Sequence, residues 1–284
     1  MPDRLKLPRP PKRRWSRRFL RRLPPPVPPD WHTGPPDFVG VGAQRSGSSW
    51  WYRVAVEAHP KVVRVEGRLK ELHYFDRFWN AKVPSDFAQH YHSYYPRPAN
   101  SITGEWTPRY MYDHWSMRLL AQAAPEARIL VILRDPIERF RSGLEGRRRL
   151  GVTRGRTLDE IATAVSRGAY TDQLRRVFDF FPRERVLVLQ YESCRADPVA
   201  EIARTWRFLG LEPAPEWQEP REPVRAPSQK LDLPPGVRDD LVARLAHDVE
   251  QVALLCPEID LSLWPSFSRD RPGSAAREGS PGSG

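Results

Sequence analysis

The sequence predicts an α/β fold of three layers, with a mostly parallel central sheet flanked by helices. Short runs rich in Val, Ile and Leu alternate along the chain with longer stretches of helical period. Uniformly apolar strands separated by helices are typical of parallel sheets that are covered on both faces. The 284 residues, 39% of them hydrophobic, are enough for one domain to bury a sizeable core.

The expected elements are defined by apolar runs and by residues that begin or end helices. Pro136 suits the first turn of one helix, Gly210 closes another, and Pro257 ends the last. We expect strands at 38–41, 62–65, 129–133 and 186–189. We expect helices at 48–58, 136–146, 171–181, 198–209 and 234–255.

The composition divides the chain into three parts. Residues 1–36 form a basic, proline-rich arm and linker, since ten of the first 22 residues are Lys or Arg. Residues 37–267 form the folded domain, and 268–284, rich in Ser, Gly, Arg and Pro, form a disordered tail. The arm also carries spaced apolar residues between its arginines. This pattern suits either an anionic membrane surface or a solvated basic tail.

Charge and cysteine usage exclude several classes of protein. The net charge is +11, but the arm carries most of it, so the folded part is nearly balanced and no nucleic-acid partner is expected. Cys194 and Cys256 are too few for a disulfide framework and lack metal-ligand spacing. No apolar run reaches the ~20 residues of a membrane-spanning helix. We therefore expect a cytoplasmic protein without a metal, and any membrane contact to be peripheral, through the arm.

A loop with the features of a phosphate-binding loop follows the first expected strand. It runs from Gly42 to Ser49 and leads into a helix, so that backbone N–H groups and the helix N-terminus can face one anion. The nucleoside triphosphate pattern G-x-x-x-x-G-K-[ST] has a lysine after its second glycine, where this chain has Ser48. The cation lies within the loop instead, at Arg45. The fold is therefore expected to be P-loop-like, without ordinary ATP or GTP hydrolysis; the structural alternative is a tight strand-to-helix turn.

A second basic position follows the strand at 129–133. Arg134 stands at its carboxyl end, where the ligands of open parallel sheets bind. Ser142 lies about two turns along the next helix and could meet Arg134 at a second anion. The structural alternative is an ion pair of Arg134 with Asp135 or Glu138.

Together, these segments resemble the two cofactor-binding signatures of sulfotransferases that use 3′-phosphoadenosine-5′-phosphosulfate (PAPS). The resemblance lies in residues 44–49 and in Arg134-Asp135-Pro136 followed by a serine eight residues after the arginine, and it extends over most of 37–211. In such enzymes the loop holds the 5′-phosphosulfate, and the arginine and serine hold the 3′-phosphate. The resemblance implies PAPS as the sulfate donor and these cofactor-binding residues: Arg45, Ser46, Gly47, Ser48, Ser49, Arg134 and Ser142.

The segment Lys70-Glu71-Leu72-His73-Tyr74-Phe75-Asp76 combines a cation, two acids and an imidazole. It resembles a segment of the heparan sulfate 3-O-sulfotransferases and their bacterial relatives in which the glutamate is the general base. The resemblance implies Glu71 as the base for an acceptor hydroxyl, and a pKa raised by partial burial would suit that role. His73 is expected to position Glu71 or the acceptor and is the second candidate for the base. Alternatively, Lys70 and Glu71 form a solvated pair and His73 merely packs.

Two positions depart from the family pattern. Arg45 stands where the family often has lysine, so it keeps the charge that stabilises an in-line displacement but cannot protonate the leaving oxygen. The segment 104–110 resembles a Gly-Glu-Lys-Thr-Pro-x-Tyr motif whose lysine helps to bind sulfate, but here Trp106 replaces it. Either Arg109, Lys70 or Lys230 supplies the missing charge, or Trp106 marks a different acceptor pocket. We therefore expect Lys70, Trp106 and Arg109 to bind substrate.

The predicted function is transfer of a sulfuryl group from PAPS to a hydroxyl of a carbohydrate, glycolipid or related metabolite. The aromatic-rich stretch 78–95 suits stacking on sugar rings but would serve equally as a lid on the core. A small-molecule kinase with a degenerate phosphate loop stays open, although it should carry a lysine after Gly47 and a magnesium-binding acid. A non-catalytic, nucleotide-binding and membrane-docking module also stays open, and it would tolerate the loss of Glu71.

Overall fold

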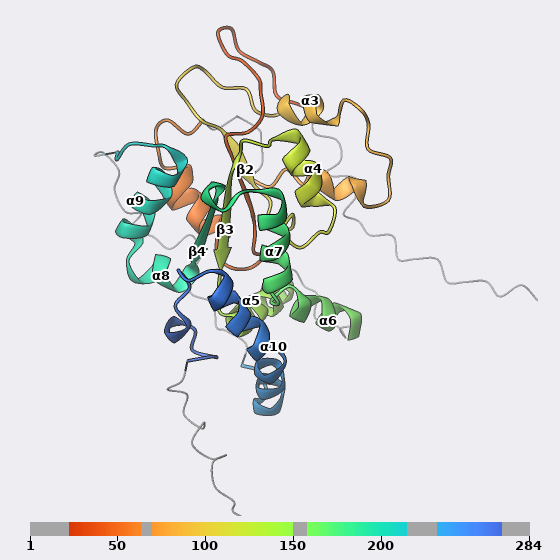
Figure 1. Cartoon of the computed structure of the whole chain (residues 1–284), viewed down its shortest axis with the longest axis vertical. Helices are drawn as coiled ribbons and strands as arrows, with labels where there is room; N and C mark the ends of the chain where they lie inside the picture. Colours follow the sequence, from red (N-terminus) through yellow and green to blue (C-terminus); the bar gives the residue numbers. More distant parts are fainter. Residues whose placement is uncertain (1–22, 64–69, 150–157, 215–231, 269–284) are drawn as a thin grey trace, which may run out of the picture.

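The computed structural model describes residues 23–63, 70–149, 158–214 and 232–268; the basic arm up to residue 22, Lys230 and the tail from 269 lie outside them. The described part contains a parallel sheet of four strands in the order β2-β1-β3-β4 (Figure 1). The strands are β1 (Phe38–Gly42), β2 (Gly104–Trp106), β3 (Arg128–Leu133) and β4 (Val186–Gln190).

Alternate residues of the strands face two separate cores. On β3, Val131 and Leu133 belong to one core, whereas Leu130 and Ile132 belong to the other. Helices α4 (Ser116–Ala123), α7 (Thr171–Phe180) and α10 (Pro235–Leu255) cover the first core. The π-helical segment η1 (Tyr52–Val56) and α9 (Pro198–Leu209) cover the second (Figure 1). This arrangement confirms the predicted three-layer α/β class.

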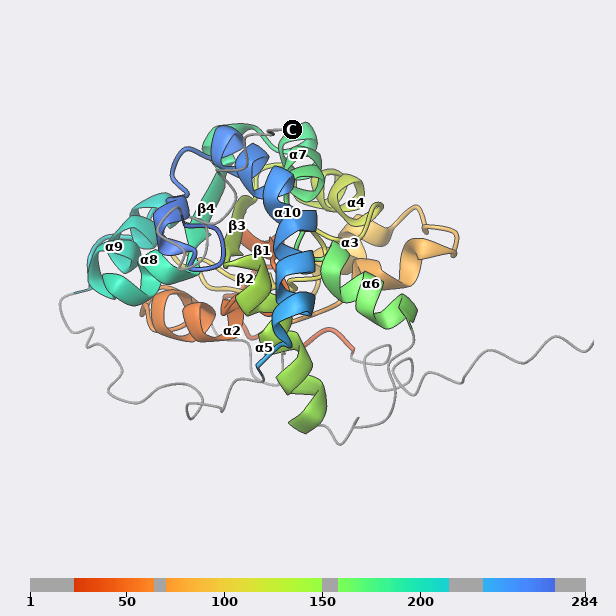
Figure 2. The same cartoon turned by 90° about the horizontal axis from the view of Figure 1, so that it is seen from below.

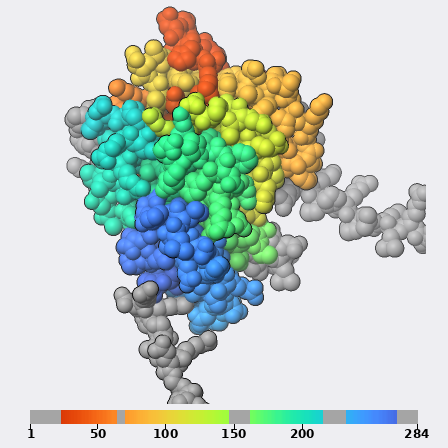
Figure 3. Space-filling view, viewed as in Figure 1, coloured from red at the N-terminus to blue at the C-terminus, as the bar shows by residue number. Residues whose placement is uncertain are grey.

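Helix α10 and the residues after it, blue in Figure 3, lie on the surface next to α7, which is green. Seen from below, α10 lies next to α5 (Pro136–Arg149), and buried residues of both helices form a small core of their own (Figure 2). After α10, Trp264 is fully buried, and its indole N–H donates to Glu192. Helix α10 thus packs against α5, the helix that follows β3, whereas Trp264 bonds to a residue that follows β4. No helix of the described residues is long and apolar enough to cross a membrane.

The remaining helices connect these layers. They are α2 (Ser48–Trp51), η2 (Phe75–Trp79), α3 (Phe87–His92), α6 (Leu158–Ser166), η3 (Arg183–Arg185), α8 (Tyr191–Ala196) and η4 (Leu261–Leu263). Helix α9 has the predicted bounds, because Asp197 accepts a hydrogen bond from the backbone N–H of Ala200 at its start and Gly210 adopts a left-handed conformation at its end.

The structure corrects two sequence-based expectations. Of the expected strand at 62–65, only 62 and 63 are described, and they form one isolated parallel bridge, between Val62 and Ile102; residues 64–69 lie outside the described part. The strand that pairs with β1 on the side away from β3 is β2. Its three residues include Glu105 and Trp106 and form no Val- or Ile-rich run. The expected helix at 48–58 is divided into α2 and the π-helical η1.

Candidate active site

The predicted phosphate-binding loop lies between β1 and α2, and the loop after β3 adjoins it because these two strands are paired. Gly47 has a φ of 94°, and a Cβ at this position would lie 2.4 Å from the ring of Tyr191. Only glycine accepts this conformation at such close range. Tyr191, the first residue of α8, therefore forms one wall of the loop, which sequence reasoning did not identify.

Arg45 crosses from the phosphate loop to helix α5. Its Nε and Nη2 donate to the backbone carbonyl oxygen of Ser142 at 3.2 and 2.7 Å. The structure thus brings together two predicted cofactor-binding residues that are 97 positions apart. Ser142 makes this contact through its carbonyl group rather than through its hydroxyl.

Arg134 also contacts the ring of Tyr191. Its guanidinium carbon is 4.5 Å from the centroid of that ring, and its Nη2 is 3.7 Å from Oε2 of Glu138. Its Nε is buried and has no hydrogen-bond partner among the described residues. Asp135, the other partner considered for Arg134, instead accepts from the backbone N–H of Ile137 at the start of α5. Tyr191 therefore joins the two predicted anion sites.

Arg139 is a third cation at this place, and sequence reasoning missed it. It lies three residues before Ser142 on α5, is almost fully buried, and donates from Nη2 to the carbonyl oxygen of Ala164. Burial, and then the nearby charges of Arg167, Arg45 and Arg134, lower its pKa to about 10. Cations that disfavour one another in this way are stabilised by a bound anion.

These residues fit a doubly phosphorylated nucleotide such as PAPS. Arg45 and Arg134, from two loops, lie close enough to Arg139 on α5 for their charges to lower its pKa. The buried Nε atoms of Arg134 and Arg139 have no hydrogen-bond partner within the described residues. Guanidinium groups of this kind bind phosphate oxygens in a fixed geometry. No group of three or more potential metal ligands occurs in the part of the chain that the structure describes.

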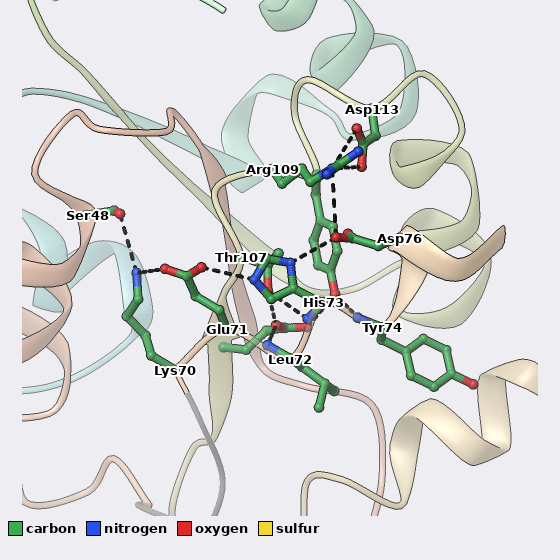
Figure 4. Close-up of polar contacts among 12 residues, drawn as sticks. Ser48, Lys70, Glu71, Leu72, His73, Tyr74, Asp76, Thr107, Arg109 and Asp113 are labelled. Carbon is green, nitrogen blue, oxygen red and sulfur yellow. Dashed lines mark hydrogen bonds and ion pairs between the residues drawn. The ribbon is translucent and has the colours of Figure 1, made fainter. Parts of the chain in front are cut away.

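A continuous chain of polar contacts runs from the phosphate loop to the predicted base (Figure 4). Lys70 Nζ lies 3.4 Å from Ser48 Oγ and 3.0 Å from Glu71 Oε1. The other oxygen of Glu71, Oε2, lies 3.1 Å from Nε2 of His73, whose Nδ1 lies 2.9 Å from Oδ2 of Asp76. Lys70, rather than a loop residue, is the cation that links the two parts of the site.

The pKa of Glu71 is lowered, contrary to the sequence-based expectation. Burial alone raises the pKa of this carboxyl, but the hydrogen bond from His73 and the charge of Lys70 outweigh it. Burial likewise lowers the pKa of His73, but its bonds to Asp76 and Glu71 prevail and raise it to about 9. At neutral pH His73 is therefore an imidazolium that donates to both carboxylates. In that form it positions Glu71 and cannot itself accept a proton.

Arg109 lies at the far end of this chain. Its Nε donates to Asp113 Oδ2 at 2.9 Å and lies 3.7 Å from Oδ2 of Asp76 (Figure 4). Burial raises the pKa of Asp113 to about 6 despite the charge of Arg109. About a third of the Arg109 side chain is exposed, and the two acids fix its orientation.

The structure buries the side chain of Trp106 in the core. Its side chain is fully buried, and its indole N–H donates to the carbonyl oxygen of Gly42 at 3.2 Å. The ring covers Gly40, where a Cβ would lie 2.1 Å from it. Trp106 thus packs on β1 as part of the second core and has no exposed surface.

A parallel sheet with a glycine-containing loop between β1 and α2 and with helices on both faces defines a P-loop-like α/β protein. Residues 35–226 match the model of the sulfotransferase domain, so the chain belongs to that family. This confirms the family predicted from the two cofactor-binding signatures.

Individual relatives agree with this assignment. The chain is 29% identical over 191 residues to human heparan sulfate glucosamine 3-O-sulfotransferase 6, covering 62% of this chain and 52% of that protein. It is 25% identical over 207 residues to human bifunctional heparan sulfate N-deacetylase/N-sulfotransferase 3, covering 65% of this chain but 23% of the relative. The chain therefore spans about half, or less, of the length of these relatives.

A solved structure supports the same fold. The crystal structure of a sulfotransferase from Alicyclobacillus acidocaldarius superimposes with a TM-score of 0.61 at 23% sequence identity. The match covers 81% of this chain and 98% of that one. The similarity thus extends beyond the sheet to most of the surrounding helices.

Proposed function

We propose that this protein transfers a sulfuryl group from PAPS to an acceptor hydroxyl, with Glu71 as the general base. The contact chain Ser48–Lys70–Glu71 carries the proposal, because it places the predicted base one lysine side chain away from the phosphate loop. A transfer reaction requires donor site and base to be adjacent in this way.

The cofactor would be held by residues of three elements. The backbone N–H groups of the loop suit its 5′ end, and Arg134, Arg139 and the Ser142 region of α5 suit its 3′-phosphate. PAPS supplies an activated sulfuryl group with adenosine 3′,5′-bisphosphate as the leaving group. Lys70 provides the positive charge at the loop that Trp106 cannot provide.

Glu71 is suited to accept the proton of the acceptor hydroxyl as its oxygen bonds to sulfur. Its lowered pKa keeps it ionised at neutral pH, and Lys70 and His73 each hold one of its oxygens. The same two cations stabilise the carboxylate in a fixed orientation. The charge that develops on the sulfuryl oxygens would face the loop and Arg45, as in related group transfers.

The acceptor is proposed to be a carbohydrate, a glycolipid or a related metabolite. The names of the relatives, which describe sulfotransfer to heparan sulfate glucosamine, support a sugar hydroxyl. A cytoplasmic location, with peripheral membrane contact through the basic arm, is part of the proposal and depends on the sequence alone.

Ligand binding separates this function from the alternatives. The thermal midpoint should rise with adenosine 3′,5′-bisphosphate more than with ATP and magnesium. Stabilisation by ATP and magnesium alone would contradict the proposal and favour a kinase.

Catalysis is tested with labelled PAPS and a panel of glycans and lipids. Glu71→Gln should lower the rate about 10²- to 10⁴-fold without changing the thermal shift by the bisphosphate, because general-base catalysis contributes about this much. The exposed Glu184→Gln serves as the matched control and should keep the wild-type rate. Equal rates for Glu71→Gln and wild type would remove Glu71 from its role, and bisphosphate binding without transfer to any acceptor would favour a binding module.

A further inference from the structure

Glu105 on β2 is a fully buried carboxylate whose hydrogen-bond donors are all neutral. Its Oε1 accepts from the hydroxyls of Tyr91, Tyr95 and Tyr110 at 2.8, 3.0 and 3.2 Å. Its Oε2 accepts from Thr107 Oγ1 and from a backbone N–H. Burying a carboxylate is unfavourable unless its oxygens are well satisfied, and five donors satisfy this one.

Three successive backbone N–H groups beside the predicted base end on this cluster. The N–H of Leu72 donates to Glu105 Oε2 at 2.8 Å, that of His73 to Thr107 Oγ1 at 3.3 Å, and that of Tyr74 to the Tyr110 hydroxyl at 2.7 Å. In an extended strand, successive N–H groups point in opposite directions. Here all three face the Glu105 carboxylate or a hydroxyl bonded to it, and this arrangement requires a turn.

The turn forces an unusual conformation on His73. Its φ is 54°, in the left-handed region that residues with a Cβ avoid. This conformation directs the imidazole between Glu71 Oε2 and Asp76 Oδ2 (Figure 4). The hydrogen bonds of residues 72–74 to the Glu105 cluster hold the segment in this arrangement.

We propose that Glu105 is a positioning residue for the Glu71–His73 pair, acting through the backbone of residues 72–74. The inference rests on the proposed function, because it assigns Glu105 an effect on the base of that reaction. Glu105 acts on both side chains of the pair through the peptide groups between them.

The network is also suited to keep this geometry over a wide pH range. Burial, followed by the charge of Glu105, raises the pKa of the Tyr91 and Tyr110 hydroxyls well above their ordinary values. Both hydroxyls therefore remain protonated donors under all conditions in which the enzyme would work. The hydrogen bonds that Glu105 accepts from Tyr91 and Tyr110 thus do not depend on titration of these two hydroxyls.

The test is Glu105→Gln, which preserves volume but presents an NH2 group to donors. The kcat for sulfate transfer should fall at least tenfold, whereas the KM for PAPS should change less than threefold, because the loop and Arg134 belong to other elements. Tyr95→Phe is the matched control, since it removes one donor from Glu105 but none of the bonds to 72–74; its kcat should stay within threefold of wild type.

A second pair of variants keeps the proposal testable if Glu105→Gln does not fold. Thr107→Ser retains the hydroxyl between Glu105 and the His73 N–H, whereas Thr107→Val removes it. Only Thr107→Val should lower kcat, and similar kcat values for the two variants would overturn the proposal.

A readout independent of activity separates this inference from the proposed function. The His73 ring is titrated by NMR in wild type and in Glu105→Gln, and its pKa should fall in the variant as its contacts with Glu71 and Asp76 loosen. A folded Glu105→Gln with unchanged His73 titration and unchanged kcat would refute the positioning role. Absence of sulfate transfer by the wild type would refute the proposed function, and the titration would then decide the positioning role alone.

Discussion

Replacing His73 with Gln should remove a pH-dependent part of the stability of the fold. The pKa of this histidine is raised from 6.5 to about 9 by its bonds to Asp76 and Glu71, which outweigh burial. The folded protein therefore holds the proton more tightly than the unfolded chain does. The difference corresponds to roughly 3 kcal/mol, fully present below pH 6.5 and lost as the pH rises through about 9.

Urea unfolding at pH 6, 7.5 and 9 measures this effect in wild type and in His73→Gln. The wild-type free energy of unfolding should exceed that of the variant by a margin that shrinks across this range, at up to about 1.4 kcal/mol per pH unit. His92→Gln is the control for the loss of an imidazole, because the His92 ring bonds to the backbone carbonyl oxygen of Ala123 and not to a carboxylate. A margin for His73→Gln that does not change with pH would refute the assignment of His73 as an imidazolium held by two carboxylates.

Three further substitutions test the loop, the core and the start of α5. Gly47→Ala should lower the free energy of unfolding by about 1–3 kcal/mol and weaken adenosine 3′,5′-bisphosphate binding. The reason is that the φ of Gly47 is 94° and Tyr191 leaves no room for a Cβ. An unchanged thermal shift by the bisphosphate would contradict this. Trp106→Lys restores the residue of the family motif. Because position 106 is fully buried, the variant should lose at least about 3 kcal/mol in the free energy of unfolding by urea and should not gain activity. A variant as stable as wild type would show that the side chain reaches solvent. Asp135→Ala should lower the free energy of unfolding by about 2 kcal/mol in the same assay, because it removes the acceptor for the N–H groups of Ile137 and Ser266. A loss under about 0.5 kcal/mol would show that water replaces the Asp135 carboxylate.

The parts of the fold that were predictable depend on local chemistry. Helix α9 begins at a side-chain cap and ends at a glycine, and both signals are visible in the sequence. The apolar strand β3 and the glycine-containing loop after β1 are likewise local patterns. Strand β2 was missed because three residues, one of them a glutamate, show no strand pattern; its place depends on pairing with β1.

The site divides in the same way. Glu71, His73 and Arg45 could be named from their motifs, but the direction of the Glu71 pKa could not, because burial and pairing act in opposite directions and only their distances decide which prevails. Arg139 carries no motif signal of its own, and its importance arises from the arginines that the fold gathers around it.

The amino-acid order alone determined the layer architecture, the phosphate loop and the family, because apolar periodicity, glycine positions and residue spacing are properties of neighbouring residues. The tertiary structure alone decided that Lys70 contacts both the loop and the predicted base, that Trp106 belongs to the core, and that Glu105 accepts a hydrogen bond from the turn at His73. These features join residues far apart in the chain, and packing rather than local preference brings such residues together.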